Sequence, residues 1–176
     1  MGEIDAARAA NGRDPLGLHD IPDGASLVHV TVERLYRLLK AQMAEALRRR
    51  GSSIVEWRIL LMLRIHGEMA QKDLVNEVAM VQAQVSRTLK AMQERGLVRG
   101  RRSHRDQRVW LFTLTADGAA LYRRIAPTMD ARRRALDGAL DGDALAGFLH
   151  GARQVAQAAA APVNDDSDQR TTNKGG

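Results

Sequence analysis

Apolar residues recur at the three- and four-residue spacing of an amphipathic helix along most of this chain. Over residues 26–50 this spacing predicts one long helix, which Gly51 ends. A second helix is predicted from Ser53 to Gly67, because Ser53 and Glu56 have the spacing of a capping box. The pattern therefore predicts two consecutive helices separated by a short turn.

The following residues predict a small unit that contains both helices and strands. Helices are expected over residues 71–79 and 82–95, and Gly96 suits a left-handed cap at the end of the second one. Alternating β-favouring residues predict a hairpin with strands at 97–102 and 109–113. Two helices followed by a hairpin are typical of a winged helix-turn-helix.

Two further helices are predicted after the hairpin. Thr115 is positioned to cap the first of them, which extends to about residue 136. The last begins at Asp141 or Asp143 and loses its apolar pattern in an alanine-rich run before Pro162. The expected fold class is mainly α with a small β-hairpin wing, in which further helices flank a winged helix-turn-helix.

The predicted elements define one domain with two irregular ends. The domain covers residues 26–160, of which 53–114 form the winged helix-turn-helix. Residues 1–25 mix glycine, proline and aspartate without periodicity, which predicts a flexible arm with neither helix nor strand. The polar residues 161–176 are predicted to be a disordered tail.

Composition excludes several classes of protein. The chain has 176 residues, no cysteine and 3% aromatic residues. Disulfides and thiolate metal sites are therefore excluded, and base-stacking modules for single strands or RNA are disfavoured. The longest wholly apolar run, residues 59–63, is too short to span a membrane, and no secretory signal pattern is visible. We expect a cytoplasmic protein that does not associate with a membrane.

Positive charge is concentrated in one stretch of the chain. The formal net charge is +6, and residues 87–108 alone carry an excess of +6. An average run of this kind is a solvated surface. Here the charges fall on a predicted helix and on the hairpin that follows it, which would present them on one side of a compact unit. This arrangement favours double-stranded DNA as the partner.

The helix that precedes the hairpin has a polar face opposite its apolar one, at about 100° per residue. Gln84 and Arg87 on that face can pair with adenine and guanine in a major groove. Gln82 and Ser86, near the helix N-terminus, can contact phosphates or bases. We expect DNA contacts from these four residues and from Lys90, against the alternative that they are solvated helix residues.

Five short segments form a series along the chain. They are Glu56-Trp57-Arg58, Gln84-Val85-Ser86-Arg87, Glu94-Arg95-Gly96-Leu97-Val98, Asp106-Gln107-Arg108 and Leu114-Thr115-Ala116-Asp117-Gly118. In this order and at these spacings the series resembles the MarR family of bacterial transcription regulators, and the flanking helices extend the resemblance over roughly residues 26–160. Val81 departs from the pattern, because family members often have a small capping residue there.

The resemblance implies a homodimer in which the helices over residues 26–50 and 115–160 interlock, so that two winged units bind the halves of a near-palindromic operator. It also implies that Arg108 enters the minor groove while Asp106 steadies it. The residue chemistry agrees, because a guanidinium suits a narrow, negative groove, and Arg105 adds to the charge there. The alternative is a surface ion pair worth at most about 1 kcal/mol.

Family members bind small anionic ligands where the dimer helices meet the winged unit, and Arg58 lies at that junction. Arg58 is either an anchor for a carboxylate or part of a structural salt bridge. Trp57 and Leu61 would line an apolar pocket, although an aromatic residue at this spacing is usually core. His29 would assist Arg58 or lie on the surface. We therefore expect an aromatic or otherwise apolar carboxylate as the small-molecule effector.

The sequence offers no catalytic or metal site. Its histidines are scattered without ligand spacing, and no nucleophile arrangement or phosphate-binding loop is present. We therefore expect neither enzymatic activity nor a cofactor. The leading hypothesis is a dimeric, sequence-specific DNA-binding regulator, a repressor released by a small molecule. The alternatives are a ligand-independent DNA-binding protein and an interaction scaffold that reuses the fold without DNA.

Overall fold

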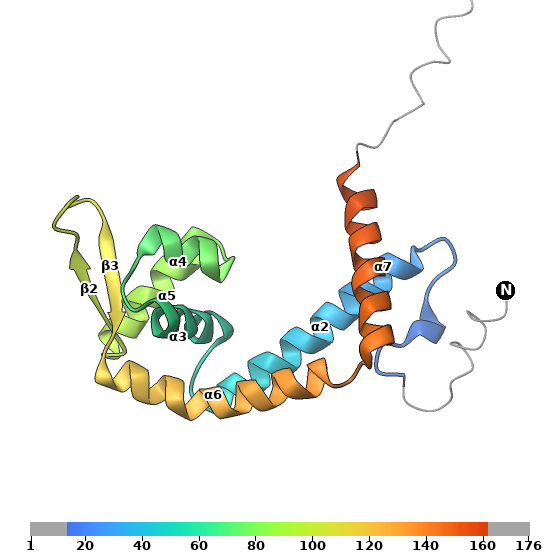
Figure 1. Ribbon diagram of the computed structural model, residues 1–176, viewed down its shortest axis with the longest axis horizontal. Helices are drawn as coiled ribbons and strands as arrows, with labels where there is room; N and C mark the ends of the chain where they lie inside the picture. Colours follow the sequence, from blue (N-terminus) through green and yellow to red (C-terminus); the bar gives the residue numbers. More distant parts are fainter. Residues whose placement is uncertain (1–13, 162–176) are drawn as a thin grey trace, which may run out of the picture. The chain divides into compact units, whose positions relative to one another are not determined.

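The computed structural model describes residues 14–161, so residues 1–13 of the predicted arm and 162–176 of the predicted tail lie outside the described residues. Figure 1 shows the elements along the chain, which divides between Met129 and Asp130 into two compact units. The elements in chain order are the 3-10 helix η1 (Leu18–Asp20), α2 (Leu27–Arg48), α3 (Ile54–His66), β1 (Met69–Ala70), α4 (Gln71–Val78), α5 (Gln82–Glu94), β2 (Val98–Arg102), β3 (Trp110–Leu114), α6 (Ala116–Asp137) and α7 (Gly142–Ala160). This order confirms the predicted fold class, mainly α with a small wing.

The first two α-helices begin at the residues that the sequence predicts. The Ser26 hydroxyl accepts a hydrogen bond from the His29 amide at 3.3 Å and caps α2. At the start of α3, the Ser53 hydroxyl accepts from the Glu56 amide at 3.2 Å, and the Glu56 carboxylate accepts from the Ser53 amide at 2.9 Å. The predicted capping box is therefore confirmed.

Helices α4 and α5 form the predicted helix-turn-helix. Ala79 adopts a left-handed conformation, with φ of 51°, and reverses the chain after α4. Helix α5 then begins at Gln82, where the sequence predicts it. Val81 occupies the cap position, and no side chain there accepts a hydrogen bond from the first amides of α5.

The predicted hairpin is present as the antiparallel pair β2–β3, and a third strand that the sequence did not predict, β1, makes the sheet three-stranded. β3 lies between β1 and β2, with Met69 opposite Phe112 and Val98 opposite Leu114. Strand β1 has only two residues, too few for the alternation by which a strand is predicted from sequence. Because β1 directly precedes α4, it connects the helix-turn-helix to the wing.

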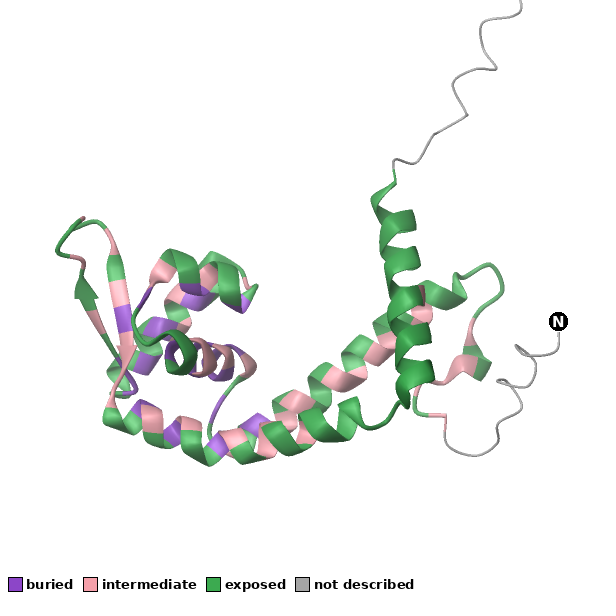
Figure 2. Ribbon diagram, viewed as in Figure 1, coloured by how far each residue is buried: buried purple, intermediate pink, exposed green. Residues whose placement is uncertain are grey.

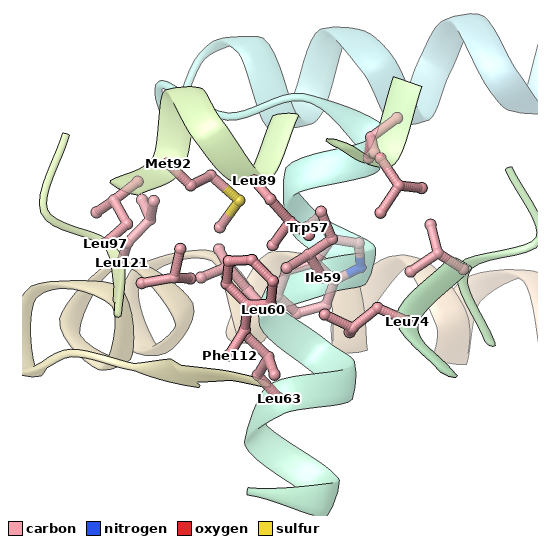
Figure 3. Packing of buried hydrophobic residues seen from close by; sticks show 14 of the residues in the cluster. Trp57, Ile59, Leu60, Leu63, Leu74, Leu89, Met92, Leu97, Phe112 and Leu121 are labelled. Atoms are coloured by element: carbon pink, nitrogen blue, oxygen red, sulfur yellow. The ribbon is translucent and has the colours of Figure 1, made fainter. Parts of the chain in front are cut away.

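Helix α3 supplies the centre of the hydrophobic core (Figures 2 and 3). Its residues Ile59, Leu60 and Leu63 are almost fully buried, in one cluster with residues of α2, α4, α5, the sheet and α6. Trp57 belongs to this cluster and stacks on Tyr122 of α6, with ring centroids 5.4 Å apart and planes at 8°. The core position expected of such an aromatic residue is thus confirmed for Trp57.

The start of α6 is attached to the base of the wing. The Thr115 hydroxyl accepts from the Gly118 amide at 3.1 Å, as predicted for a cap, and donates to the Gly96 carbonyl at 2.6 Å. A Cβ atom added at Gly118 would lie 2.0 Å from the carbonyl oxygen of Leu97. Only glycine therefore allows α6 to approach the chain this closely.

The described chain differs from the expectation at its N-terminal end, and near its C-terminal end it selects one of the two predicted helix caps. Residues 14–20 include the 3-10 helix η1, where the sequence predicted neither helix nor strand, and Arg34 of α2 donates to the carbonyls of Leu16 and Gly17. In the second unit, Asp141 rather than Asp143 caps α7, since its carboxylate accepts from the Ala144 amide at 2.8 Å.

Candidate nucleic-acid interface

Helix α5 is oriented as the sequence predicts. Its apolar residues Val85, Leu89 and Met92 are buried in the core, and Figure 3 shows Leu89 and Met92 there. Its exposed residues include Gln82, Gln84, Arg87 and Lys90. The polar face of α5 is therefore open to a partner, while contacts between these residues and DNA stay a prediction.

Ser86 has a different setting from the other predicted contacts on α5. It is half-buried, and its hydroxyl oxygen accepts a hydrogen bond from the Gln71 side-chain amide of α4 at 2.7 Å. Ser86 lines a hollow of about 200 Å³ between α5 and β3, which we call the crease. The residues that line the crease are Gln71, Ser86, Leu89, Lys90, Gln93, Trp110 and Phe112.

The tip of the wing holds the predicted pair of Arg108 and Asp106. The Arg108 guanidinium donates to the two carboxylate oxygens of Asp106 at 3.1 and 3.2 Å, and the Arg108 amide donates to the same carboxylate at 2.9 Å. The side chain of Arg108 is nevertheless 91% exposed. The nearby Arg105 is also exposed, with its amide bonded to the Ser103 hydroxyl at 3.2 Å. The pair is thus preorganised and accessible.

This contact favours the ionised form of the Asp106 carboxylate. The bond from the Arg108 guanidinium, followed by the bond from the Arg108 amide, lowers the pKa of Asp106 below its ordinary value of 3.8. At neutral pH the carboxylate therefore remains an acceptor that restrains the Arg108 side chain.

Strands β2 and β3 add a cation that the sequence analysis did not single out. Arg102 and Trp110 are directly opposed in the sheet, and the Arg102 guanidinium carbon lies 4.5 Å from the centre of the Trp110 ring. Predicting this contact requires the exact register of the hairpin, in which β3 begins at Trp110 rather than at residue 109.

Arg95 belongs to the structural framework rather than to the exposed basic surface. It forms an ion pair with Glu56 at the start of α3 and donates to the Gly51 carbonyl at 3.1 Å. The Glu56 side chain is only 10% exposed, so its charge needs this partner as well as the Ser53 amide. The end of α5 is thereby fixed to the turn between α2 and α3.

Arg101 is likewise engaged with an acidic residue outside the basic stretch. It donates to both carboxylate oxygens of Glu68, which lies between α3 and β1, at 2.9 and 2.6 Å. Glu56 and Glu68 together lower the local excess of charge around residues 87–108 from six to four. The positive charge that is available to attract a partner is therefore smaller than the net charge counted from residues 87–108 alone.

The predicted ligand-binding residues are only partly brought together. Trp57 is buried, Leu61 is half-buried, and Arg58 donates to the carbonyl of Val78 at the end of α4, at 2.8 Å. This bond to a backbone carbonyl is neither of the two roles predicted for Arg58. His29 is exposed in the first turn of α2, about 27 Å along the helix from Leu47, where α2 enters the core.

The structure contains a larger cavity elsewhere on α3, which we call the α3–α6 cavity. It has a volume of about 520 Å³ and lies between the end of α3, β3 and the first half of α6. Its lining consists of Leu63, Arg64, Gly67, Glu68, Thr113, Leu114, Ala119, Tyr122 and Arg123. None of the four predicted ligand-binding residues lines it, although Tyr122 is the stacking partner of Trp57.

The helix-turn-helix and the wing are similar in sequence to known transcription regulators. The sequence model of the MarR family matches residues 53–110, which include α3, the helix-turn-helix and the wing as far as the first residue of β3. The winged segment of this chain is therefore similar to the MarR family. The HTH-type transcriptional regulator FarR of Neisseria gonorrhoeae is 29% identical over 82 residues, 47% of this chain and 56% of FarR. The matched stretch thus spans only about half of that relative.

Solved structures of regulators share the fold over a longer stretch. AbsC, a MarR family transcriptional regulator from Streptomyces coelicolor, aligns with a TM-score of 0.69 at 22% identity, covering 79% of this chain and 96% of AbsC. BpsR of Bordetella bronchiseptica, whose DNA binding is regulated by 6-hydroxynicotinic acid, aligns with a TM-score of 0.64 at 23% identity, covering 74% and 99%. At these identities the likeness establishes the fold alone.

The MarR-family match also bears on the expected absence of catalysis. The matched proteins are transcriptional regulators rather than enzymes. Within residues 14–161, the structure forms no cluster of three or more metal-ligating side chains, and none of the described helices is long and apolar enough to cross a membrane.

Proposed function

We propose that the protein is a transcriptional regulator that binds double-stranded DNA as a homodimer, with α5 in the major groove and the wing in the minor groove. The observation that carries the proposal is the combination of an exposed polar face on α5 with Arg108, which Asp106 holds at an exposed wing tip. The match of residues 53–110 to the MarR family model supports it.

Within this proposal the exposed residues have separate roles. Gln82, Gln84 and Arg87 contact the major groove, where Gln pairs with adenine and Arg with guanine. Arg108 and Arg105 contact the minor groove, whose negative potential is greatest where it is narrow. Asp106 acts on Arg108 and touches no DNA.

Dimer formation is proposed from the apolar residues that the two units leave exposed. On α2, Val28, Val32 and Tyr36 are exposed, and Tyr36 is 62% exposed. On α7, no residue is buried, and Phe148 is 54% exposed. Exposed apolar stripes on two separate long helices are typical of an interface, and a second copy of the chain would cover both.

The small-molecule effector is proposed to be an aromatic or otherwise apolar carboxylate. The α3–α6 cavity supports this chemistry, because apolar walls of Leu63, Leu114 and Tyr122 stand beside the guanidinium-bearing Arg64 and Arg123. BpsR, a protein of the same fold, responds to an aromatic acid. The effector would favour a spacing of the two winged units that no longer fits successive major grooves, which makes the protein a repressor released by its ligand.

Arg58 and Arg123 are the competing anchors for that carboxylate. Calorimetric screening of aromatic acids against the wild type, Arg58→Ala and Arg123→Ala distinguishes them, because only the loss of the anchor abolishes binding while the protein stays folded. If Arg58→Ala unfolds, the role of Arg58 is structural, because its bond to the Val78 carbonyl holds the helix-turn-helix in place. Acids that bind all three proteins equally would exclude both anchors.

The DNA-binding proposal is tested by selecting duplexes from a randomised library with the full-length protein. We expect one near-palindromic sequence to be enriched, and Gln84→Ala and Arg87→Ala to relax the preference at particular positions of each half. Arg108→Ala should weaken binding most on duplexes with an A·T-rich minor groove. Enrichment of no sequence would favour the alternative of an interaction scaffold, and a selected complex that no small molecule weakens would favour a ligand-independent DNA-binding protein.

A further inference from the structure

We infer that the crease between α5 and β3 is a seat for one phosphate of the DNA backbone, and that Lys90 and Ser86 hold this phosphate rather than contact bases. The inference rests on the proposed DNA-binding function and assigns a site within it. It also gives roles to Gln71 and Trp110, which the sequence analysis did not connect with DNA.

The position of the crease follows from the two elements that flank it. If α5 enters a major groove and the wing tip enters the adjacent minor groove, the sugar-phosphate strand that separates those grooves must cross between them. The crease is lined by residues of α5 on one side and of β3 on the other. It therefore lies on the path of that strand.

The polar lining of the crease suits a phosphate. Ser86 and Lys90 are one helical turn apart on α5, and both line the hollow. None of the seven lining residues is acidic, and Lys90 contributes a full positive charge. A phosphodiester only accepts hydrogen bonds, so it matches an ammonium group and a hydroxyl donor.

The bond between Gln71 and Ser86 makes the serine a donor. The Ser86 oxygen already accepts from the Gln71 amide at 2.7 Å, so its own proton must point away from that amide. Gln71 is thus a positioning residue, which acts on the phosphate through Ser86. Trp110 lines the opposite wall, and the guanidinium of Arg102 lies over its ring. Arg102 therefore adds positive potential beside the crease.

The size of the crease also favours a phosphate over a small-molecule effector. Its volume of about 200 Å³ lies below the roughly 300 to 1,000 Å³ usual for pockets that enclose an organic ligand. The floor of the crease, Leu89 and Phe112, is buried core. Gln84 and Arg87 do not line it, which leaves the rest of the exposed α5 face for base contacts.

The first test uses the duplex enriched by the wild-type protein and measures affinity at several salt concentrations. We expect Lys90→Gln to reduce the slope of log K against log salt by about one and to leave the selected sequence unchanged. Arg49→Gln, which removes the same charge from the exposed end of α2, is the control and should leave the slope unchanged. A changed base preference in Lys90→Gln would overturn the inference, as would an unchanged slope.

The second test replaces single phosphates of that duplex with neutral methylphosphonates. One position in each half should weaken binding of the wild type by about tenfold and of Lys90→Gln by much less, because both changes remove the same contact. If the loss of affinity caused by the methylphosphonate and the loss caused by Lys90→Gln add fully when both changes are present, the phosphate is not bound in the crease.

The roles of the uncharged residues are tested by Ser86→Ala and Gln71→Met. Each should lower affinity severalfold without altering the salt slope, and Gln71→Met should have no further effect in the Ser86→Ala background. An effect of Gln71→Met that persists in that background would make Gln71 merely structural. Failure of the wild type to bind any duplex would instead reject the proposed function, whereas selective binding that ignores these variants rejects the seat alone.

Discussion

At the scale of single residues, the arginines of the basic stretch divide into structural and exposed groups. Arg95 satisfies the nearly buried carboxylate of Glu56, while Arg108 is held by Asp106 yet remains open. The contact between Arg108 and Asp106 could be predicted, because the two residues are neighbours in one tight turn. The contact between Arg95 and Glu56 could not, because the two residues are 39 positions apart in the chain.

Arg95→Ala is expected to destabilise the fold by about 2 kcal/mol, because it leaves the Glu56 carboxylate buried with one fewer partner. Urea unfolding measures the change. Arg99→Ala, which removes an exposed arginine of β2, is the matched control and should stay within about 0.5 kcal/mol of the wild type. Equal stability of the two variants would show that the Glu56 pair contributes nothing.

The contact at the wing tip predicts a pH dependence. Because the Arg108 bond lowers the pKa of Asp106 below 3.8, its contribution is present above that pH and is lost as the pH falls through the lowered value. In a carboxyl-carbon NMR titration, Arg108→Gln should move the Asp106 midpoint up towards 3.8. Arg105→Gln should leave it where it is, and an unmoved midpoint in Arg108→Gln would contradict the pairing.

At the scale of elements, the helices could be predicted from local signals in the sequence. The features that depend on contacts between distant residues could not. The capping box at Ser53, the cap at Thr115 and the turn at Gly96 are all encoded within a few residues, so their helices begin and end close to the predicted positions. β1 is different, because a two-residue strand exists only through its pairing with β3. Arg58 is similar, since its partner Val78 is reached only after α4 folds back.

Gly118→Ala tests the junction between α6 and the wing. The added Cβ would lie 2.0 Å from the Leu97 carbonyl, so α6 must move, and we expect a loss of about 3 kcal/mol in unfolding free energy. Gly142→Ala, at the start of α7, meets nothing within 4 Å and should be neutral or slightly stabilising. Equal effects in thermal unfolding would contradict the close approach at Gly118.

At the scale of the whole molecule, the proposed binding to a near-palindromic operator requires two copies of the chain. Sedimentation at low micromolar concentration should give a species of twice the 19.4 kDa chain mass. Val32→Glu, which places a charge in the exposed apolar stripe of α2, should shift it towards monomer, whereas Gln42→Glu adds the same charge at a polar position and should not. A monomeric wild type that still binds its selected duplex would refute the dimer.

Sequence-specific DNA binding is tested by the affinity of the full-length protein for its selected duplex and for a scrambled duplex of the same composition, measured over a range of salt concentrations. We expect log K to fall linearly and steeply with log salt on both duplexes, because exposed arginines and Lys90 displace counterions, and the selected duplex to bind more tightly at every salt concentration. An affinity that is independent of salt, or equal for the two duplexes at every salt concentration, would contradict it.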